Sequence, residues 1–197
     1  MVVPLPKYVA ITTISRKKFL RPTGSSGLLK LDDVDILSWG VKHEVVQSKI
    51  EPGMVHIKCV DTGKYWSWGL DSDSEDYIAA QRKNKETDQS SNACTLIKYS
   101  SHTRNGVSVF KLRFMWESEW HVICQDDRAF LVSGVRKGGE TSTNFVIEDW
   151  EKLARSSQSQ KHTSTGKPKM ITGGGATTKE VEYQMQRMIV RESCPSP

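Results

Sequence analysis

Three apolar positions with the same internal spacing occur three times along this chain of 197 residues. The three sets are Ile11, Ile14 and Phe19, then Ile57, Val60 and Tyr65, and then Leu112, Met115 and Trp120. Repeats of about 50 residues are typical of folds whose units cannot bury their own apolar faces and pack against one another. Three units favour a closed all-β fold over an open solenoid.

A second apolar pattern closes each repeat, at residues 43–46, 94–97 and 144–147. Between these patterns, short alternating runs are separated by turn signals such as Thr23–Gly27 and Glu51–Gly53. Many short strands joined by tight turns are typical of β-barrels. We also expect a helical turn within residues 32–39 and a short helix over residues 147–154.

The repeats predict which aromatic side chains face the core. Phe19, Tyr65 and Trp120 occupy equivalent positions, and equivalent positions of a threefold barrel face the common interior. Because side chains alternate along a strand, we expect the next residues, Trp66 and His121, to point outward. Trp68 shares the strand face of Trp66. Two indoles on an outer surface would be costly to expose without a ligand, so this pair is a candidate binding surface.

Charge is spread unevenly along the chain. The formal net charge is +5, but residues 1–150 carry 20 basic and 19 acidic side chains, whereas residues 151–197 carry 8 and 4. All six tryptophans lie at or before Trp150. A core-forming domain therefore ends near Trp150, and a polar, basic segment follows it. Nucleic-acid binding needs a concentrated basic face, so we expect no nucleic-acid partner for the main domain.

The cysteines and the N-terminal residues indicate a reducing compartment. The four cysteines show no paired metal-ligand spacing, and buried thiols explain them better than disulfides, although disulfides stay an alternative. Residues 1–7 do not have the pattern of a signal peptide, and no apolar run is long enough to span a membrane. These features predict a reducing setting, either cytosolic or nuclear.

The residues after Arg155 have a different composition. Residues 156–160 and 172–175 are rich in Ser, Gln and Gly and resemble linkers. In residues 178–192, the apolar positions fit an alternating strand and also fit one face of a helix. The pattern leaves these two alternatives open.

Four segments together resemble the agglutinin domain of the amaranthin-like plant lectins. They are Met54–Lys58, Gly63–Tyr65, Asn92–Leu96 and Val146–Trp150, in the family's order and with similar spacing. The resemblance covers roughly residues 3–152. It implies a β-trefoil domain at residues 3–153. The composition of residues 154–197 predicts a polar, linker-like tail, with the start of a second module as the alternative.

The resemblance also implies sugar binding without catalysis. The usual ligands are glycans that contain galactose or N-acetylgalactosamine, such as Gal-β1,3-GalNAc, and such lectins stay in the cytoplasm and nucleus. In tandem-domain relatives the sugar lies between subunits, so a site of that kind would need a homodimer here. The loop between Trp68 and Tyr77 is longer and more acidic than the family pattern, and ligand contacts are expected in this loop and the one after β-like residues 77–80.

These loops supply the candidate carbohydrate-binding residues. A sugar stacks its flat C–H face on an aromatic ring and pairs its hydroxyls with polar side chains. This chemistry selects the following residues: Trp66, Trp68, Asp71, Ser72, Asp76, Tyr77 and Asn84. For the acidic residues, a solvated loop is the alternative interpretation, and a calcium site is disfavoured because no EF-hand spacing occurs.

No motif of catalysis or cofactor binding is present in the sequence. His56 and Cys59 fall on opposite faces of a strand, so they make a poor metal site. No catalytic triad order, P-loop or dinucleotide motif occurs. The sequence therefore predicts a non-enzyme without metal or cofactor. The alternatives to a lectin are a protein-interaction trefoil that has lost sugar binding, and the targeting domain of a truncated fusion with an aerolysin-like, pore-forming module.

Overall fold

The computed structural model describes residues 4–14, 18–50, 53–69, 77–91, 94–116, 118–134 and 143–163. The chain divides into two compact units, residues 1–161 and 162–197. Only two residues of the second unit are described, so the account below concerns the first. The predicted strand or helix at residues 178–192 lies outside the described residues.

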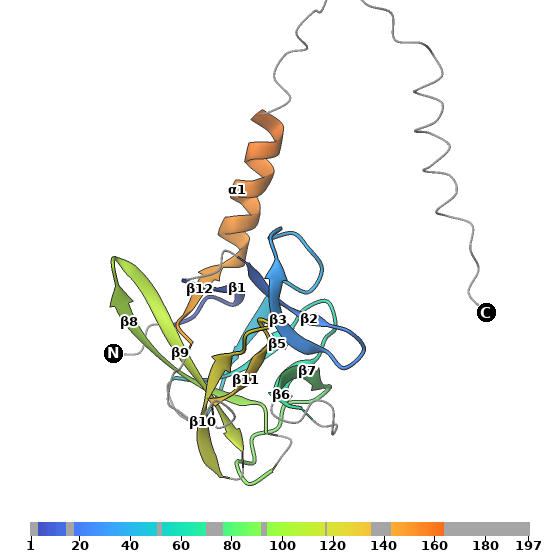
Figure 1. The fold of residues 1–197 in the computed structure, drawn as a ribbon, viewed down its shortest axis with the longest axis vertical. Coiled ribbons are helices and arrows are strands. Elements are labelled where there is room, and N and C mark those ends of the chain that lie inside the picture. The colour runs from blue at the N-terminus through green and yellow to red at the C-terminus, as the bar shows by residue number, and fades with distance from the viewer. Residues whose placement is uncertain are drawn as a thin grey trace, which may run out of the picture. The chain divides into compact units, whose positions relative to one another are not determined.

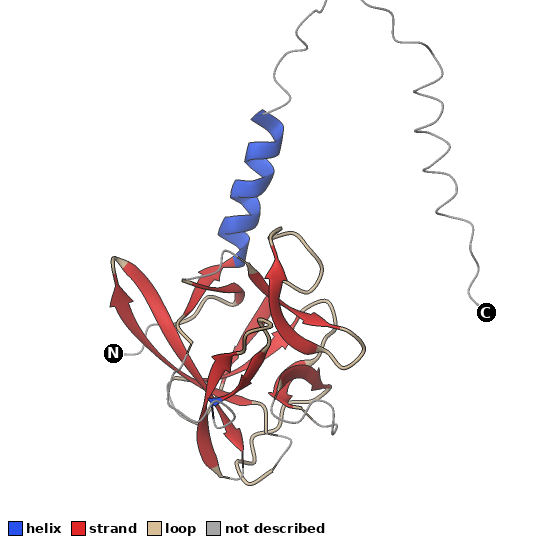
Figure 2. Ribbon diagram, in the orientation of Figure 1, coloured by secondary structure: helices blue, strands red, loops and turns tan. Residues whose placement is uncertain are grey.

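Short antiparallel strands make up most of the described structure, which is all-β as predicted (Figures 1 and 2). The strands and the helix are β1 (Tyr8–Thr13), β2 (Phe19–Thr23), β3 (Leu28–Asp33), β4 (His43–Gln47), β5 (Met54–Cys59), β6 (Tyr65–Trp68), β7 (Ile78–Arg82), β8 (Leu96–Arg104), β9 (Val107–Trp116), β10 (Glu119–Gln125), β11 (Leu131–Ser133), β12 (Phe145–Asp149) and α1 (Trp150–Thr163).

Six of the strands pair into a closed ring. Strand β1 pairs with β4, β4 with β5, β5 with β8, β8 with β9, β9 with β12, and β12 with β1 again. Closure satisfies the backbone hydrogen-bonding groups that an open sheet would leave at its edges. The ring joins the two ends of the domain, because the last strand pairs with the first.

The remaining six strands form three hairpins, β2–β3, β6–β7 and β10–β11. Strand β3 pairs with β7, and single bridges link Lys30 to Phe130 and Tyr77 to Val132. Each predicted repeat therefore supplies two ring strands and one hairpin. The threefold repetition seen in the sequence is thus present in the strand pairing.

The first apolar position of each repeat enters the common core. Ile11, Ile57 and Leu112 are fully buried in one cluster. The second position behaves differently: Ile14 is exposed, whereas Met115 packs in a separate small cluster. In each repeat, the pattern therefore identified a core residue correctly at the first apolar position. It did not do so at the second position of every repeat.

The prediction for the third apolar position is wrong by one residue. Tyr65 is only half-buried, whereas its neighbour Trp66 is fully buried in the core. Phe19 and Leu20 show the same relation. A strand shifted by one residue exchanges its two faces, and irregularities in register occur at both of these steps. The shift buries the indole of Trp66, whose apolar surface is larger than that of the Tyr65 ring.

Helix α1 begins where β12 ends. The predicted helix over residues 147–154 is present only in part, because residues 147–149 are still in β12 and the helix continues to Thr163. The Asp149 carboxylate caps the helix by accepting hydrogen bonds from the backbone N–H of Glu151 and Lys152. The predicted boundary between residues 153 and 154 falls inside this helix. In the described part of the chain no helix is long and apolar enough to cross a membrane.

Replacing Asp149 with alanine should lower the free energy of unfolding by about 1 kcal/mol, because two N–H groups of the first helical turn lose their acceptor. Urea denaturation of the two proteins measures the difference. The control is Lys152→Ala, which removes an exposed ammonium 3.9 Å from Asp149 and should change stability by less than about 0.5 kcal/mol. Equal effects of the two substitutions would contradict the capping role.

Candidate functional site

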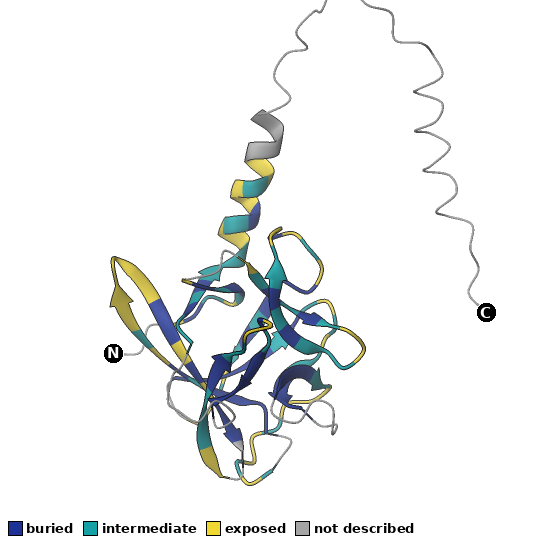
Figure 3. Cartoon of the chain, viewed as in Figure 1, coloured by how far each residue is buried: buried dark blue, intermediate teal, exposed yellow. Residues whose placement is uncertain are grey.

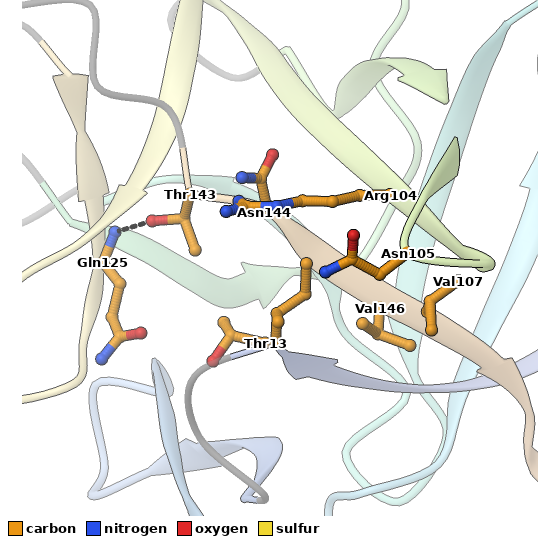
Figure 4. Close-up of a pocket in the computed structure, with 9 residues that line it drawn as sticks. Thr13, Arg104, Asn105, Val107, Gln125, Thr143, Asn144 and Val146 are labelled. Carbon is orange, nitrogen blue, oxygen red and sulfur yellow. Dashed lines mark hydrogen bonds between the residues drawn. The ribbon is translucent and has the colours of Figure 1, made fainter. Parts of the chain in front are cut away.

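A pocket of about 650 Å³ opens beside the tip of the β8–β9 hairpin. It combines the end of β1, the end of β10 and the start of β12 with that hairpin (Figure 4). The lining residues are Thr13, Ile14, Arg104, Asn105, Val107, Gln125, Thr143, Asn144 and Val146. The volume lies within the range of small-molecule sites in proteins.

The hairpin wall of the pocket is held by a tight turn. Strands β8 and β9 pair in continuous register from Ile97–Phe114 to Arg104–Val107. The two turn residues, Asn105 and Gly106, have φ angles of 51° and 77°. Asn-Gly is the preferred sequence for a two-residue turn in which both residues have positive φ. The turn therefore fixes where Arg104, Asn105 and Val107 enter the pocket wall.

The opposite wall is built by the closure of the ring. Pairing of β1 with β12 sets Thr13 opposite Phe145 and so brings Thr13 close to Asn144. The Thr143 hydroxyl accepts a hydrogen bond of 2.7 Å from the backbone N–H of Gln125. The side-chain oxygen of Asn144 is buried and has no hydrogen-bond partner among the described residues. Asn144 lines the pocket, so a turn of its side chain would let the amide pair with the hydroxyl of a ligand.

The lining has one apolar and one polar part. Ile14 and Val107 are about half exposed, and with Val146 they form the apolar part. The polar part consists of amide and hydroxyl side chains, and Arg104 is the only charged residue of the nine. None of these nine described residues carries a carboxylate, an imidazole or a thiol. The described lining suits the binding of a polar molecule that has one apolar face.

The model of the agglutinin domain matches residues 3–132. The chain belongs to the agglutinin domain family. The match confirms the resemblance to the amaranthin-like lectins that the sequence segments indicated. It includes the hairpin wall of the pocket and ends before Thr143 and Asn144.

Two further comparisons add little to this assignment. A search of curated proteins finds no match to this chain. Among solved structures, the GlcNAcα1-4Gal-releasing endo-β-galactosidase from Clostridium perfringens aligns with a TM-score of 0.49 and 16% sequence identity. The alignment covers 72% of this chain and 32% of that enzyme, so this chain spans about a third of its length.

The agglutinin domain buries the two predicted aromatic ligands. Trp66 lies in the core with its ring edge against His43, at 5.2 Å between ring centroids. Trp68 is 7% exposed and stacks on Phe114 at 4.8 Å. The prediction that this pair forms an outer surface is therefore wrong, because both indoles point to the interior face of β6.

The other predicted site residues are scattered. Tyr77 is buried beside Cys124 and Val132, and its hydroxyl accepts a hydrogen bond from the Arg128 guanidinium. Asn84 is exposed on the segment after β7. The predicted residues Asp71, Ser72 and Asp76 lie outside the described residues. None of the four described candidates lines the pocket.

Two histidines of the agglutinin domain are buried in its interior. His43 is fully buried, its Nε2 lies 3.2 Å from the Leu20 carbonyl oxygen, and burial lowers its pKa to about 4. His56 Nδ1 lies 2.8 Å from the Thr95 hydroxyl, and burial also lowers its pKa. Cys59 and Cys94 are buried free thiols. Within the described ranges no group of three potential ligands could hold a metal ion.

Proposed function

We propose that this chain is a non-catalytic, glycan-binding lectin domain with the β-trefoil fold. The observation that carries the proposal is its membership of the agglutinin domain family. The closed ring of six strands and the three hairpins support the trefoil, because three repeats of four strands would produce this pairing. The described pocket lining of amide, hydroxyl and aliphatic side chains supports the binding of a polar ligand.

The pocket beside the β8–β9 hairpin is the glycan site in this proposal. The apolar face of a sugar ring would lie on Ile14, Val107 and Val146. The amides of Asn105 and Asn144 would bind its hydroxyls, each contributing roughly 0.5–1.5 kcal/mol. A shallow site of this kind binds a single sugar with about millimolar to micromolar affinity.

Galactose and N-acetylgalactosamine glycans, such as Gal-β1,3-GalNAc, are the ligand class we propose, on the strength of the family resemblance. The same resemblance leads us to propose a homodimer and a cytoplasmic and nuclear location. Self-association would raise the apparent affinity for surfaces that carry many copies of the sugar, because a second contact forms at high effective concentration.

A glycan array probed with the full chain, presented multivalently, tests this function. We expect selective binding to galactose or N-acetylgalactosamine glycans, and about fivefold weaker binding by Asn144→Ala, since one hydroxyl contact is lost. Asn84→Ala makes the same change at the predicted loop site and should bind as the parent chain does. Weaker binding by Asn84→Ala together with unchanged binding by Asn144→Ala would indicate that the sugar binds at the loops and not in the pocket.

One observation favours a second function, a protein-interaction module. Val34, Leu37 and Trp39 are exposed apolar side chains within a single loop between β3 and β4. Such a group is typical of a protein contact surface. A folded chain that binds no glycan on the array, and that loses association with a protein partner on Trp39→Ala, would favour this second function over the lectin.

A further inference from the structure

We propose that the pocket takes an acidic sugar, a hexuronate of galactose configuration, and that Arg104 pairs with its carboxylate. This inference rests on the proposed glycan-binding function and specifies the ligand of that same site. A galacturonate differs from galactose only at C6, where a carboxylate replaces the CH₂OH group. The new contact is therefore the one at C6, and the sugar hydroxyls would still bind the amides of Asn105 and Asn144.

The first argument is the charge of the pocket. Among the described residues that line it, Arg104 is the one with a charged side chain, and none of them is acidic. A lone cation in a site otherwise made of amides, hydroxyls and aliphatic groups favours a ligand with a single negative charge. A neutral sugar would leave this guanidinium without an ionic partner.

The second argument is that Arg104 has no ion-pair partner among the described residues, unlike three other arginines of the domain. Arg21 pairs with Asp32 at 2.7 Å, Arg128 with Asp126 at 3.6 Å, and Arg155 with Glu151 at 3.4 Å. Arg104 lies on the exposed tip of the β8–β9 hairpin (Figure 3). Its guanidinium is therefore accessible to a ligand.

The third argument is the placement of Arg104 by the backbone. It is the last residue of β8, and its pairing with Val107 across the Asn105-Gly106 turn fixes where its side chain starts. In Figure 4 this side chain extends from the hairpin toward the wall that contains Thr143 and Asn144. A sugar whose hydroxyls bind the Asn144 amide would thus have its C6 carboxylate close to Arg104.

The fourth argument is chemical. The planar guanidinium can donate two parallel N–H groups to the two oxygens of a carboxylate, a geometry that a lysine ammonium cannot reproduce. A sulfate ester on the same sugar would supply the same charge with a tetrahedral arrangement of oxygens. The planar match is why the proposal specifies a carboxylate, and a sulfated sugar serves as a separate arm of the test.

The test measures the affinity of the full chain for three matched methyl galactosides by ligand titration followed by NMR. The ligands are methyl galactopyranoside, methyl galactopyranosiduronate and the methyl ester of that uronate, and galactose 6-sulfate is titrated as the separate sulfate arm. We expect the uronate to bind about tenfold more tightly than its neutral ester. The preference should shrink as ionic strength rises, because salt screens an exposed ion pair.

Two variants assign the preference to Arg104. Arg104→Gln should bring the ratio of uronate to ester affinity close to one. Arg113→Gln removes an equal charge from an exposed position on β9 outside the pocket and should keep the ratio of the parent chain. Thermal melting of both variants establishes that they are folded.

Several results would overturn the proposal. Equal affinity of the parent chain for uronate and ester would contradict the preference for an acidic sugar, and the proposed lectin function would still stand. A preference that persists in Arg104→Gln, or disappears equally in Arg113→Gln, would remove the role of Arg104. Tighter binding of galactose 6-sulfate than of the uronate would replace the carboxylate by a sulfate. No binding of any of these sugars, together with a silent glycan array, would reject the lectin function itself.

Discussion

Replacing Trp66 with alanine is expected to lower the free energy of unfolding by about 3–5 kcal/mol. The indole is fully buried in the main core and contacts the ring of His43, so its removal leaves a cavity lined by apolar side chains. The loss includes the transfer free energy of the indole and the contacts of the residues around it. Urea denaturation monitored by circular dichroism measures the change.

Trp39→Ala is the matched control for this experiment. Trp39 is 56% exposed, so the same substitution should change the unfolding free energy by less than about 0.5 kcal/mol. The comparison also tests the earlier interpretation of Trp66 as a sugar-stacking residue. A Trp66→Ala chain that keeps its stability and loses glycan binding would restore that interpretation and contradict the buried position.

The free energy of unfolding should fall by about 3 kcal/mol between pH 7 and pH 4 through His43 alone. The pKa of His43 is about 4 in the folded domain because burial disfavours the imidazolium, and it is about 6.5 in an unfolded chain. Between these values the unfolded state binds more protons than the folded state. Stability from this group is therefore complete above about pH 6.5 and is lost as the pH falls toward 4.

Denaturation at pH 7, 5.5 and 4, for the parent chain and two variants, tests this pH dependence. His43→Gln should have a lower stability at pH 7 and a much smaller change between pH 7 and pH 4. His102→Gln alters an exposed position of β8 and should keep the pH dependence of the parent chain. An unchanged slope in His43→Gln would show that other groups cause the acid sensitivity, and His56, whose pKa burial also lowers, is the next to test.

The two tryptophans of β6 show what the alternation of side chains along a strand can predict and what it cannot. Alternation correctly put Trp66 and Trp68 on one face of β6. It could not say which face, because a one-residue shift of register exchanges the two faces without changing the spacing. The shift occurs between Tyr65 and Trp66, where β6 meets β7. Burial of two indoles, and not the repeat spacing, decides which face is inside.

The pocket shows a second limit. Its walls come from residues 13–14, 104–105, 107, 125, 143–144 and 146, which belong to all three repeats. The Asn105-Gly106 turn was the only local signal in the sequence that could have pointed to this site. The walls meet because β12 pairs with β1, a contact between the two ends of the domain. Alternation and turn patterns describe residues that are close in sequence. They therefore cannot predict the pairing of β1 with β12.

The all-β class, the three repeats and the core positions Ile11, Ile57 and Leu112 could be predicted from the local pattern of the chain. They follow from alternation, turn residues and spacing, which every segment carries. The resemblance to the agglutinin domain family rests instead on four short segments of the sequence. The buried face of β6 and the residues that line the pocket could be found only from the folded domain, because strand register and ring closure are set by the burial of apolar surface across all its strands.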